Sequence, residues 1–172
     1  GSVRKLIGIR TIFNMLGPLM NPANVKNQLV GVYSVDVFNL YKDVFKNDPK
    51  KNVCLISGYD GNDEISLDGS NLIFIKDCDT FEFDPITLDI PRSNIKELSG
   101  GDSKFNSERI IELFKGKKDS FYYAVCINAA FGVLLDQGKK PCKENILEAY
   151  NAAKSIIKDG APLEVIKKLS NF

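Results

Sequence analysis

Residues 28–57 read QLVGVYSVDVFNLYKDVFKNDPKKNVCLIS and contain three successive patterns of apolar residues. Residues 28–34 form a compact, valine-rich segment that is typical of a β-strand. Residues 36–46 carry apolar side chains at helical spacing, and residues 52–57 form a second apolar strand. The expected helical face comprises Val37, Leu40, Tyr41, Val44 and Phe45. A strand, a helix and a strand within about thirty residues predict a βαβ unit with parallel strands.

The remainder of the chain indicates two short strands followed by helices. Residues 71–76 and 80–84 are two short apolar runs that predict a hairpin or an edge pair. Helical patterns follow at about residues 104–115, 120–137 and 143–158, and after Gly160. The residues expected to face inward in the first of these helices are Ser107, Ile110, Ile111 and Phe114. The expected fold class is α/β: a partial, mostly parallel sheet with a short antiparallel pair and flanking C-terminal helices.

Composition excludes several classes of protein. The chain has 172 residues, 44% apolar and 26% charged, which is typical of one globular domain. Because Lys and Arg number 23 and Asp and Glu number 22, we expect no nucleic-acid partner. No apolar run has the length of a membrane span, and the start is not a secretory signal, so we expect no membrane association. We interpret residues 1–2, Gly-Ser, as a tag remnant.

The cysteine and histidine content limits the catalytic and metal-binding chemistry that this chain can perform. The four cysteines, at 54, 78, 126 and 142, include no Cys-x-x-Cys pair. Cys54 and Cys126 lie in apolar runs and are expected in the core as reduced thiols of a cytoplasmic protein. The sequence has no histidine, which excludes a histidine-dependent catalytic triad and histidine-ligated zinc within this chain.

The segment after the second strand, residues 58–66, reads GYDGNDEIS and concentrates carboxylates in a turn. Adjacent side chains in a tight turn need not point to opposite faces, so Asp63 and Glu64 can reach one cation. A few oxygen ligands on a turn suit Mg²⁺, which keeps most of its waters and binds phosphate oxygens of a substrate. The alternative is a charged, solvated turn at the end of a strand, and the spacing alone favours that alternative.

Two segments near the start carry candidate binding residues. Arg4, with Lys5 and Arg10, can bind a carboxylate or a phosphate, and Arg is suited to bidentate carboxylate recognition. The alternative for these three residues is a solvated helix face. Residues 17–22, GPLMNP, suit a rigid loop that lines a substrate site, or a plain connector from a helix to a strand.

Two further segments are interpreted structurally. Residues 100–103, GGDS, open a helix, and we favour a capping role over anion binding because Asp102 would repel a phosphate. Asn128 lies in an alanine-rich helix, and we expect it to be a buried polar group bonded to a neighbouring loop.

Residues 3–23, VRKLIGIRTIFNMLGPLMNPA, resemble the middle signature of the anthranilate phosphoribosyltransferase family. Residues 28–33, QLVGVY, are similar to the strand that follows that signature. Three further motifs then occur in the order of the family: GNDEIS at 61–66, GGD at 100–102 and NAA at 128–130. The resemblance covers nearly the whole chain, and the first segment and the Asp-Glu turn are its specific parts.

This resemblance implies an enzyme of tryptophan biosynthesis that moves the phosphoribosyl group of phosphoribosyl pyrophosphate onto anthranilate. It implies Mg²⁺ as the cofactor, with Asp63 and Glu64 as the metal-binding pair. Arg4 corresponds to the arginine that contacts the anthranilate carboxylate, and Gly17 and Pro18 correspond to the loop that lines the aromatic-acid channel. No residue is assigned as catalytic, because positioning and electrostatics would assist the reaction.

The sequence departs from the family in one large respect. The glycine-rich Gly-Thr-Gly-Gly-Asp loop and the Lys-His-Gly-Asn segment of the family lie upstream of the middle signature, and neither occurs here. Residues 3–172 therefore correspond to the C-terminal part of the α/β phosphoribosyltransferase domain, and we expect this chain alone to be inactive. The full-length enzyme is expected to be a homodimer through contacts largely in the missing region, and the oligomeric state of this chain stays open.

Two other functions remain as alternatives. One is a non-catalytic binding or regulatory module that kept the fold; some relatives bind nucleic acid, against which the balanced charge argues. The other is a relative of pyrimidine nucleoside phosphorylase, which shares the architecture and the run around GPLMNP. The turn that contains Asp63 and Glu64 favours the transferase.

Overall fold

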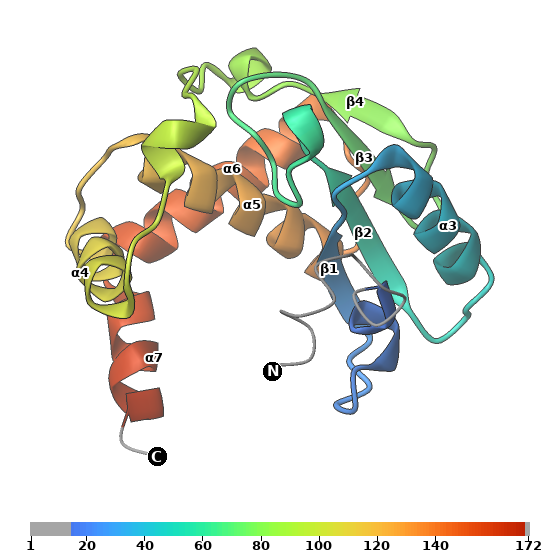
Figure 1. Cartoon of the computed structure of the whole chain (residues 1–172), viewed down its shortest axis with the longest axis horizontal. Helices are drawn as coiled ribbons and strands as arrows, with labels where there is room; N and C mark the ends of the chain where they lie inside the picture. The colour runs from blue at the N-terminus through green and yellow to red at the C-terminus, as the bar shows by residue number, and fades with distance from the viewer. Residues whose placement is uncertain (1–14, 171–172) are drawn as a thin grey trace, which may run out of the picture.

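The computed structural model describes residues 15–170, so the binding role predicted for Arg4 lies outside the described residues. Four strands form one sheet in the order β1-β2-β3-β4 (Figure 1). Their bounds are Asn27–Gly31 for β1, Asn52–Ser57 for β2, Asn71–Ile75 for β3 and Phe81–Phe83 for β4. Among the described strands, β1 and β4 are therefore the two edges.

The sheet is mixed. β1 and β2 run parallel with Leu29 opposite Cys54, as the βαβ pattern predicted. β2 and β3 run antiparallel with Ile56 opposite Ile73, and β3 and β4 form the predicted antiparallel pair. The α/β class is confirmed, but the described sheet is less parallel than predicted, because β1 and β2 form its one parallel pair and the other two pairs are antiparallel.

Helices cover both faces of β2, which explains its continuous apolar run. Val53 and Leu55 pack in the same cluster as α3 (Val35–Lys46), whereas Cys54 and Ile56 pack with α5 (Ser120–Asp136). Figure 1 shows these two helices on opposite sides of the sheet. A strand buried on both faces loses the alternation of apolar and polar residues that a half-exposed strand shows.

Helix α3 begins after Ser34, whose Oγ accepts a hydrogen bond from the Val37 N–H at 3.4 Å. Two predicted core positions are wrong, because Leu40 is 49% exposed and Val44 is 42% exposed. The buried residues of the helix are Val37, Phe38, Tyr41 and Phe45. At 3.6 residues per turn these four side chains form one stripe, and Leu40 and Val44 lie on the flank beyond it.

The C-terminal region is helical, as predicted. The remaining helices are α4 (Ser103–Phe114), α6 (Lys143–Lys158) and α7 (Ala161–Ser170). α5 and α6 share the core of this layer, and each is followed two residues after its end by a glycine, Gly138 or Gly160, whose φ angles are +63° and +72°. α4 lies at the periphery and buries only Leu113. The prediction that Ser107 and Ile111 face inward is therefore wrong, since both are exposed.

Two composition-based expectations can be compared with the described residues. Cys54 and Cys126 are buried as predicted, and all four cysteines are free thiols. No helix within residues 15–170 has the length and apolarity needed to cross a membrane.

Candidate metal and substrate site at the acidic turn

The acidic turn, defined here as residues 58–66, leaves the carboxyl end of β2 and includes the short 3₁₀ helix η2 (Tyr59–Gly61). Asp63 and Glu64 are both exposed, and both line one cavity of about 620 Å³. The rest of the lining is mainly apolar and comes from β1, β2, η4 (Ile95–Leu98) and α5. Its main apolar lining residues are Leu29, Leu98, Phe121 and Val125. The structure thus brings the two predicted metal-binding carboxylates into one concave surface.

Two glycines allow the acidic turn to lie directly on the sheet. A Cβ atom placed on Gly31 would lie 1.6 Å from the backbone oxygen of Asp63, and one on Gly58 would lie 2.1 Å from that of Glu64. Both distances are far inside van der Waals contact. Any larger residue at either position would therefore displace the backbone that carries the carboxylates.

Asn71, which is fully buried, connects the two ends of the acidic turn. Its Oδ1 accepts hydrogen bonds from the N–H groups of Tyr59 at 3.2 Å and Ser66 at 2.7 Å. Its Nδ2 donates to the carbonyl oxygens of Ser66, Gly69 and Phe83 at 3.0 to 3.1 Å. Sequence reasoning missed this residue, because the only signal is an asparagine at the first position of a strand.

Asn128 of α5 holds the acidic turn near its end, at Ile65. Its Oδ1 accepts from the Ile65 N–H at 2.9 Å, and its Nδ2 donates to the Ala124 carbonyl at 2.9 Å and to the Ile65 carbonyl at 3.4 Å. The prediction that Asn128 bonds a neighbouring loop is confirmed. The burial predicted for Asn128 is only partial, because the residue is half-buried where it lines the cavity.

The carboxylates of Asp63 and Glu64 are available to a ligand. Within residues 15–170, neither side chain belongs to an ion pair, and no group of three or more Asp, Glu, Cys or His residues is placed to hold a metal ion. Two exposed carboxylates form an incomplete set of protein ligands. Such a set fits Mg²⁺, which retains several waters and completes its octahedron with substrate phosphate oxygens.

The predicted channel loop lies apart from the carboxylates. Gly17 precedes the short 3₁₀ helix η1 (Pro18–Met20), and the Pro18 carbonyl accepts a hydrogen bond from the Gln28 Nε2 at 3.0 Å. This contact ties the loop to the start of β1, whereas the acidic turn touches the other end of that strand at Gly31. Neither Gly17 nor Pro18 lines the acidic-turn cavity.

The remaining sequence motif, residues 100–103, caps the N-terminus of α4. Asp102 precedes α4, and its Oδ1 accepts a hydrogen bond from the Phe105 N–H at 2.8 Å. The capping role that we favoured for residues 100–103 is confirmed.

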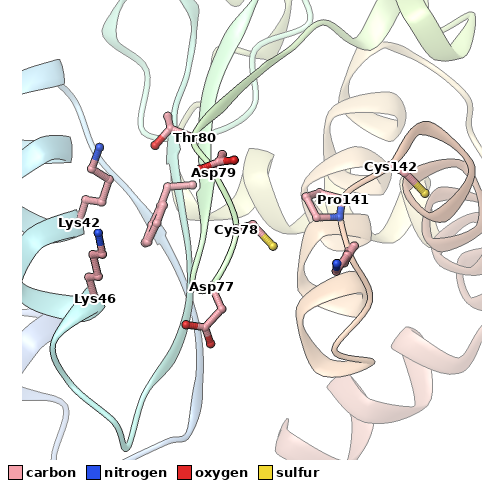
Figure 2. A pocket seen from close by; sticks show the side chains of 10 residues that line it. Lys42, Lys46, Asp77, Cys78, Asp79, Thr80, Pro141 and Cys142 are labelled. Carbon is pink, nitrogen blue, oxygen red and sulfur yellow. The ribbon is translucent and has the colours of Figure 1, made fainter.

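Another cavity, of about 710 Å³, lies elsewhere among the described residues. Figure 2 shows Lys42 and Lys46 of α3 on one side of it, the turn from Asp77 to Thr80 at its centre, and the segment before α6 on the other side. Because β3 runs antiparallel to β2, this turn is at the amino end of β2, opposite the acidic turn. Its lining mixes lysines with aspartates and includes no residue of the acidic turn.

The sequence of this chain is similar to those of known proteins. The family described as "Glycosyl transferase family, a/b domain" matches residues 1–163. Anthranilate phosphoribosyltransferase from Pelagibacter ubique is 37% identical over 99% of this chain and 52% of its own length. The protein of that name from Desulforamulus reducens is 37% identical over 98% of this chain and 49% of its own length. The chain thus spans about half the length of the curated relatives it matches.

This chain also matches about half the length of each similar solved structure. Anthranilate phosphoribosyltransferase from Saccharomyces cerevisiae in complex with PRPP and Mg superposes with a TM-score of 0.85 and 26% identity, over 96% of this chain and 47% of that chain. The enzyme from Thermus thermophilus superposes with a TM-score of 0.78 and 25% identity, over 98% of this chain and 49% of that chain. Together with the family match over residues 1–163, these findings show that the chain belongs to the glycosyl transferase family, as part of its a/b domain.

Proposed function

We propose that this chain is the C-terminal portion of a Mg²⁺-dependent anthranilate phosphoribosyltransferase, an enzyme of tryptophan biosynthesis. One observation carries the proposal: Asp63 and Glu64 line the same cavity, at the carboxyl end of the parallel strands, and neither is ion-paired within the described residues. The names of the relatives and the yeast complex with PRPP and Mg support the substrate and the metal.

The residues present fit the proposed chemistry. Asp63 and Glu64 would hold the cation, and bound Mg²⁺ would neutralise the charge of the departing diphosphate. Asn71 and Asn128 keep the acidic turn in place through hydrogen bonds to its backbone. The apolar lining at Phe121 would limit the access of water to a substrate bound there. Because the aromatic amine of anthranilate is neutral near pH 7, no strong base is required from this chain.

We also propose that the chain is inactive by itself. Carboxylates cannot hold a diphosphate without the cation between them, because like charges repel. The glycine-rich loop that would bind the diphosphate in the family is not in the sequence. The four free thiols support a reducing compartment, which we propose to be the cytoplasm.

A fused protein tests the function. The N-terminal half of the Pelagibacter ubique relative would be joined to residues 3–172, and the loss of anthranilate fluorescence would be followed with phosphoribosyl pyrophosphate and Mg²⁺. We expect turnover by the fused protein, no turnover by the isolated chain, and a loss of about 100-fold or more in the fused Asp63→Asn/Glu64→Gln variant. A folded fusion that binds phosphoribosyl pyrophosphate but leaves anthranilate unchanged would contradict the proposal.

The same fused protein distinguishes the alternatives. A relative of pyrimidine nucleoside phosphorylase would cleave thymidine in the presence of inorganic phosphate. A non-catalytic nucleic-acid-binding module would bind DNA with an affinity that falls steeply as salt is raised. We expect neither result.

A further inference from the structure

A separate cavity of about 410 Å³ lies in the helical layer, where the loop after α4 meets α5 and α6. Its charged lining residues are four lysines: Lys115, Lys118, Lys154 and Lys158. Within residues 15–170 no carboxylate lines this lysine cavity, and it shares no lining residue with the acidic-turn cavity.

The four ammonium groups have no acidic partners in the part of the chain that the structure describes. The ion pairs found there use other cations, namely Arg92, Lys117, Lys139 and Lys167. The protein as a whole is balanced, with 23 basic and 22 acidic residues. Four like charges around one cavity are therefore a local excess, whose mutual repulsion a bound anion would relieve.

Aromatic contacts hold two of the four ammonium groups at the cavity. The Nζ of Lys154 lies 5.0 Å from the centroid of the Tyr150 ring and donates a hydrogen bond to the Asn151 Oδ1 at 3.4 Å. The Nζ of Lys118 lies 6.0 Å from the centroid of the Tyr122 ring, and Tyr122 is only 4% exposed. A cation over an aromatic face loses less freedom when it binds a ligand than a freely rotating lysine does.

The nearest carboxylates along the chain interact with other groups. Asp119 caps α5 by accepting from the Tyr122 N–H at 3.1 Å, and its second oxygen lies 3.8 Å from the Nζ of Lys117. Asp159 accepts a hydrogen bond from the Ser155 Oγ at 3.4 Å. Neither Asp119 nor Asp159 lines the lysine cavity, so neither neutralises it from within.

We propose that the lysine cavity binds a small anion that carries two or more phosphoryl groups. Lysine ammonium groups bind phosphate as point charges, and the cavity volume is in the range of small-molecule sites. An extended nucleic acid fits less well, because the excess of lysines surrounds one cavity of a nearly neutral protein instead of following a face. This proposal stands on its own and does not require the transferase activity.

Titration of the ¹⁵N-labelled chain with inorganic diphosphate tests the proposal. A chelator in the buffer prevents any metal ion from bridging diphosphate to Asp63 and Glu64. We expect saturable shifts of the amide signals of Gly116, Lys118 and Ser155, with the signals of Gly61 and Asp63 unchanged. The Lys118→Gln/Lys154→Gln variant should bind about tenfold more weakly, since each exposed charge contact contributes up to about fivefold.

A matched control removes two lysines from a different cavity. The Lys42→Gln/Lys46→Gln variant lowers the net charge equally, but its substitutions line the cavity beside α3. We expect it to bind diphosphate within about twofold of the unchanged chain. The proposal is overturned if diphosphate shifts only the amide signals of the acidic turn. It is also overturned if the shifts do not saturate by about 10 mM diphosphate, which corresponds to weak but measurable binding. Equal weakening of binding in the two double variants would overturn it too. Tighter binding of a DNA or RNA oligonucleotide than of diphosphate, at the same lysines, would overturn it as well.

Discussion

The Oδ1 of Asn71 accepts a hydrogen bond from the backbone N–H of Ser66 at 2.7 Å, which joins the first residue of β3 to the last residue of the acidic turn. The same oxygen accepts from Tyr59 at the beginning of the turn. One side chain therefore fixes both ends of the segment that carries Asp63 and Glu64. Because Asn71 is fully buried, water cannot replace these bonds.

Replacement of Asn71 should destabilise the protein strongly. Asn71→Ala leaves several backbone groups of the turn without partners, and we expect the free energy of unfolding to fall by about 3 kcal/mol. Urea unfolding measures this change. Asn94→Ala is the control, because Asn94 is an exposed cap whose side chain accepts one hydrogen bond from the described residues, that of the Lys96 N–H, and it should lose less than about 1 kcal/mol. Equal losses in the two variants would contradict the role assigned to Asn71.

Replacement of Gly31 tests the close approach of β1 to the acidic turn. In Gly31→Ala the new methyl group would overlap the Asp63 carbonyl, which lies 1.6 Å from its position, so the backbone must move. We expect a loss of about 1–3 kcal/mol in the free energy of unfolding. Gly17→Ala is the matched control, because a Cβ there meets none of the described residues within 4 Å, and its stability should change by less than about 0.5 kcal/mol. Thermal unfolding of the three proteins gives the comparison.

Metal binding by the isolated chain should be weak. Asp63 and Glu64 supply only two carboxylates, so we expect a dissociation constant for Mn²⁺ of about 1 mM or weaker, measured by the relaxation of water protons. The Asp63→Asn/Glu64→Gln variant should lose this binding. The control, Asp77→Asn/Asp79→Asn, changes a different acidic turn and should keep it. Submicromolar binding by the unchanged chain would show that the described site has ligands beyond these two carboxylates.

The stability of the helical layer should fall in alkaline solution. Burial raises the pKa of Tyr122 to about 12 from its ordinary value of 10.0, and the neighbouring Cys126 adds to the shift. Burial likewise raises the pKa of Cys126 to about 11 from 9.0. The folded state holds these protons more tightly than the unfolded state, so their contribution is fully present below about pH 9 and is lost as the pH rises toward about 12.

Urea unfolding under reducing conditions, repeated between about pH 8 and 11, measures this loss. Tyr122→Phe removes one of the two groups, and the decline with pH should become shallower. A variant whose free energy of unfolding declines in parallel with that of the unchanged protein would show that Tyr122 does not contribute. Low temperature and short incubation limit chemical damage to the thiols.

Local patterns in the sequence were sufficient to predict the helices and strands and to locate the pair of carboxylates. The run of apolar residues at 53–56 predicted β2, and the glycine-marked turn after it located Asp63 and Glu64. Patterns could not assign the inner face of α3 correctly, because Phe38 rather than Leu40 faces the sheet. Which flank of a helix is covered depends on the angle at which it crosses a narrow sheet, and the sequence of the helix does not contain that angle.

The sequence of this protein was enough to establish the βαβ unit, the hairpin, the C-terminal helices and the acidic turn, since each depends on residues close together in the chain. Only the tertiary structure showed that Gly31 must be a glycine, that Asn71 joins both ends of the turn, and that the lysines of α6 share a cavity with Lys118. These relationships join segments that are distant along the chain. Packing of the strands and helices determines which of those segments meet, so no local pattern reports them.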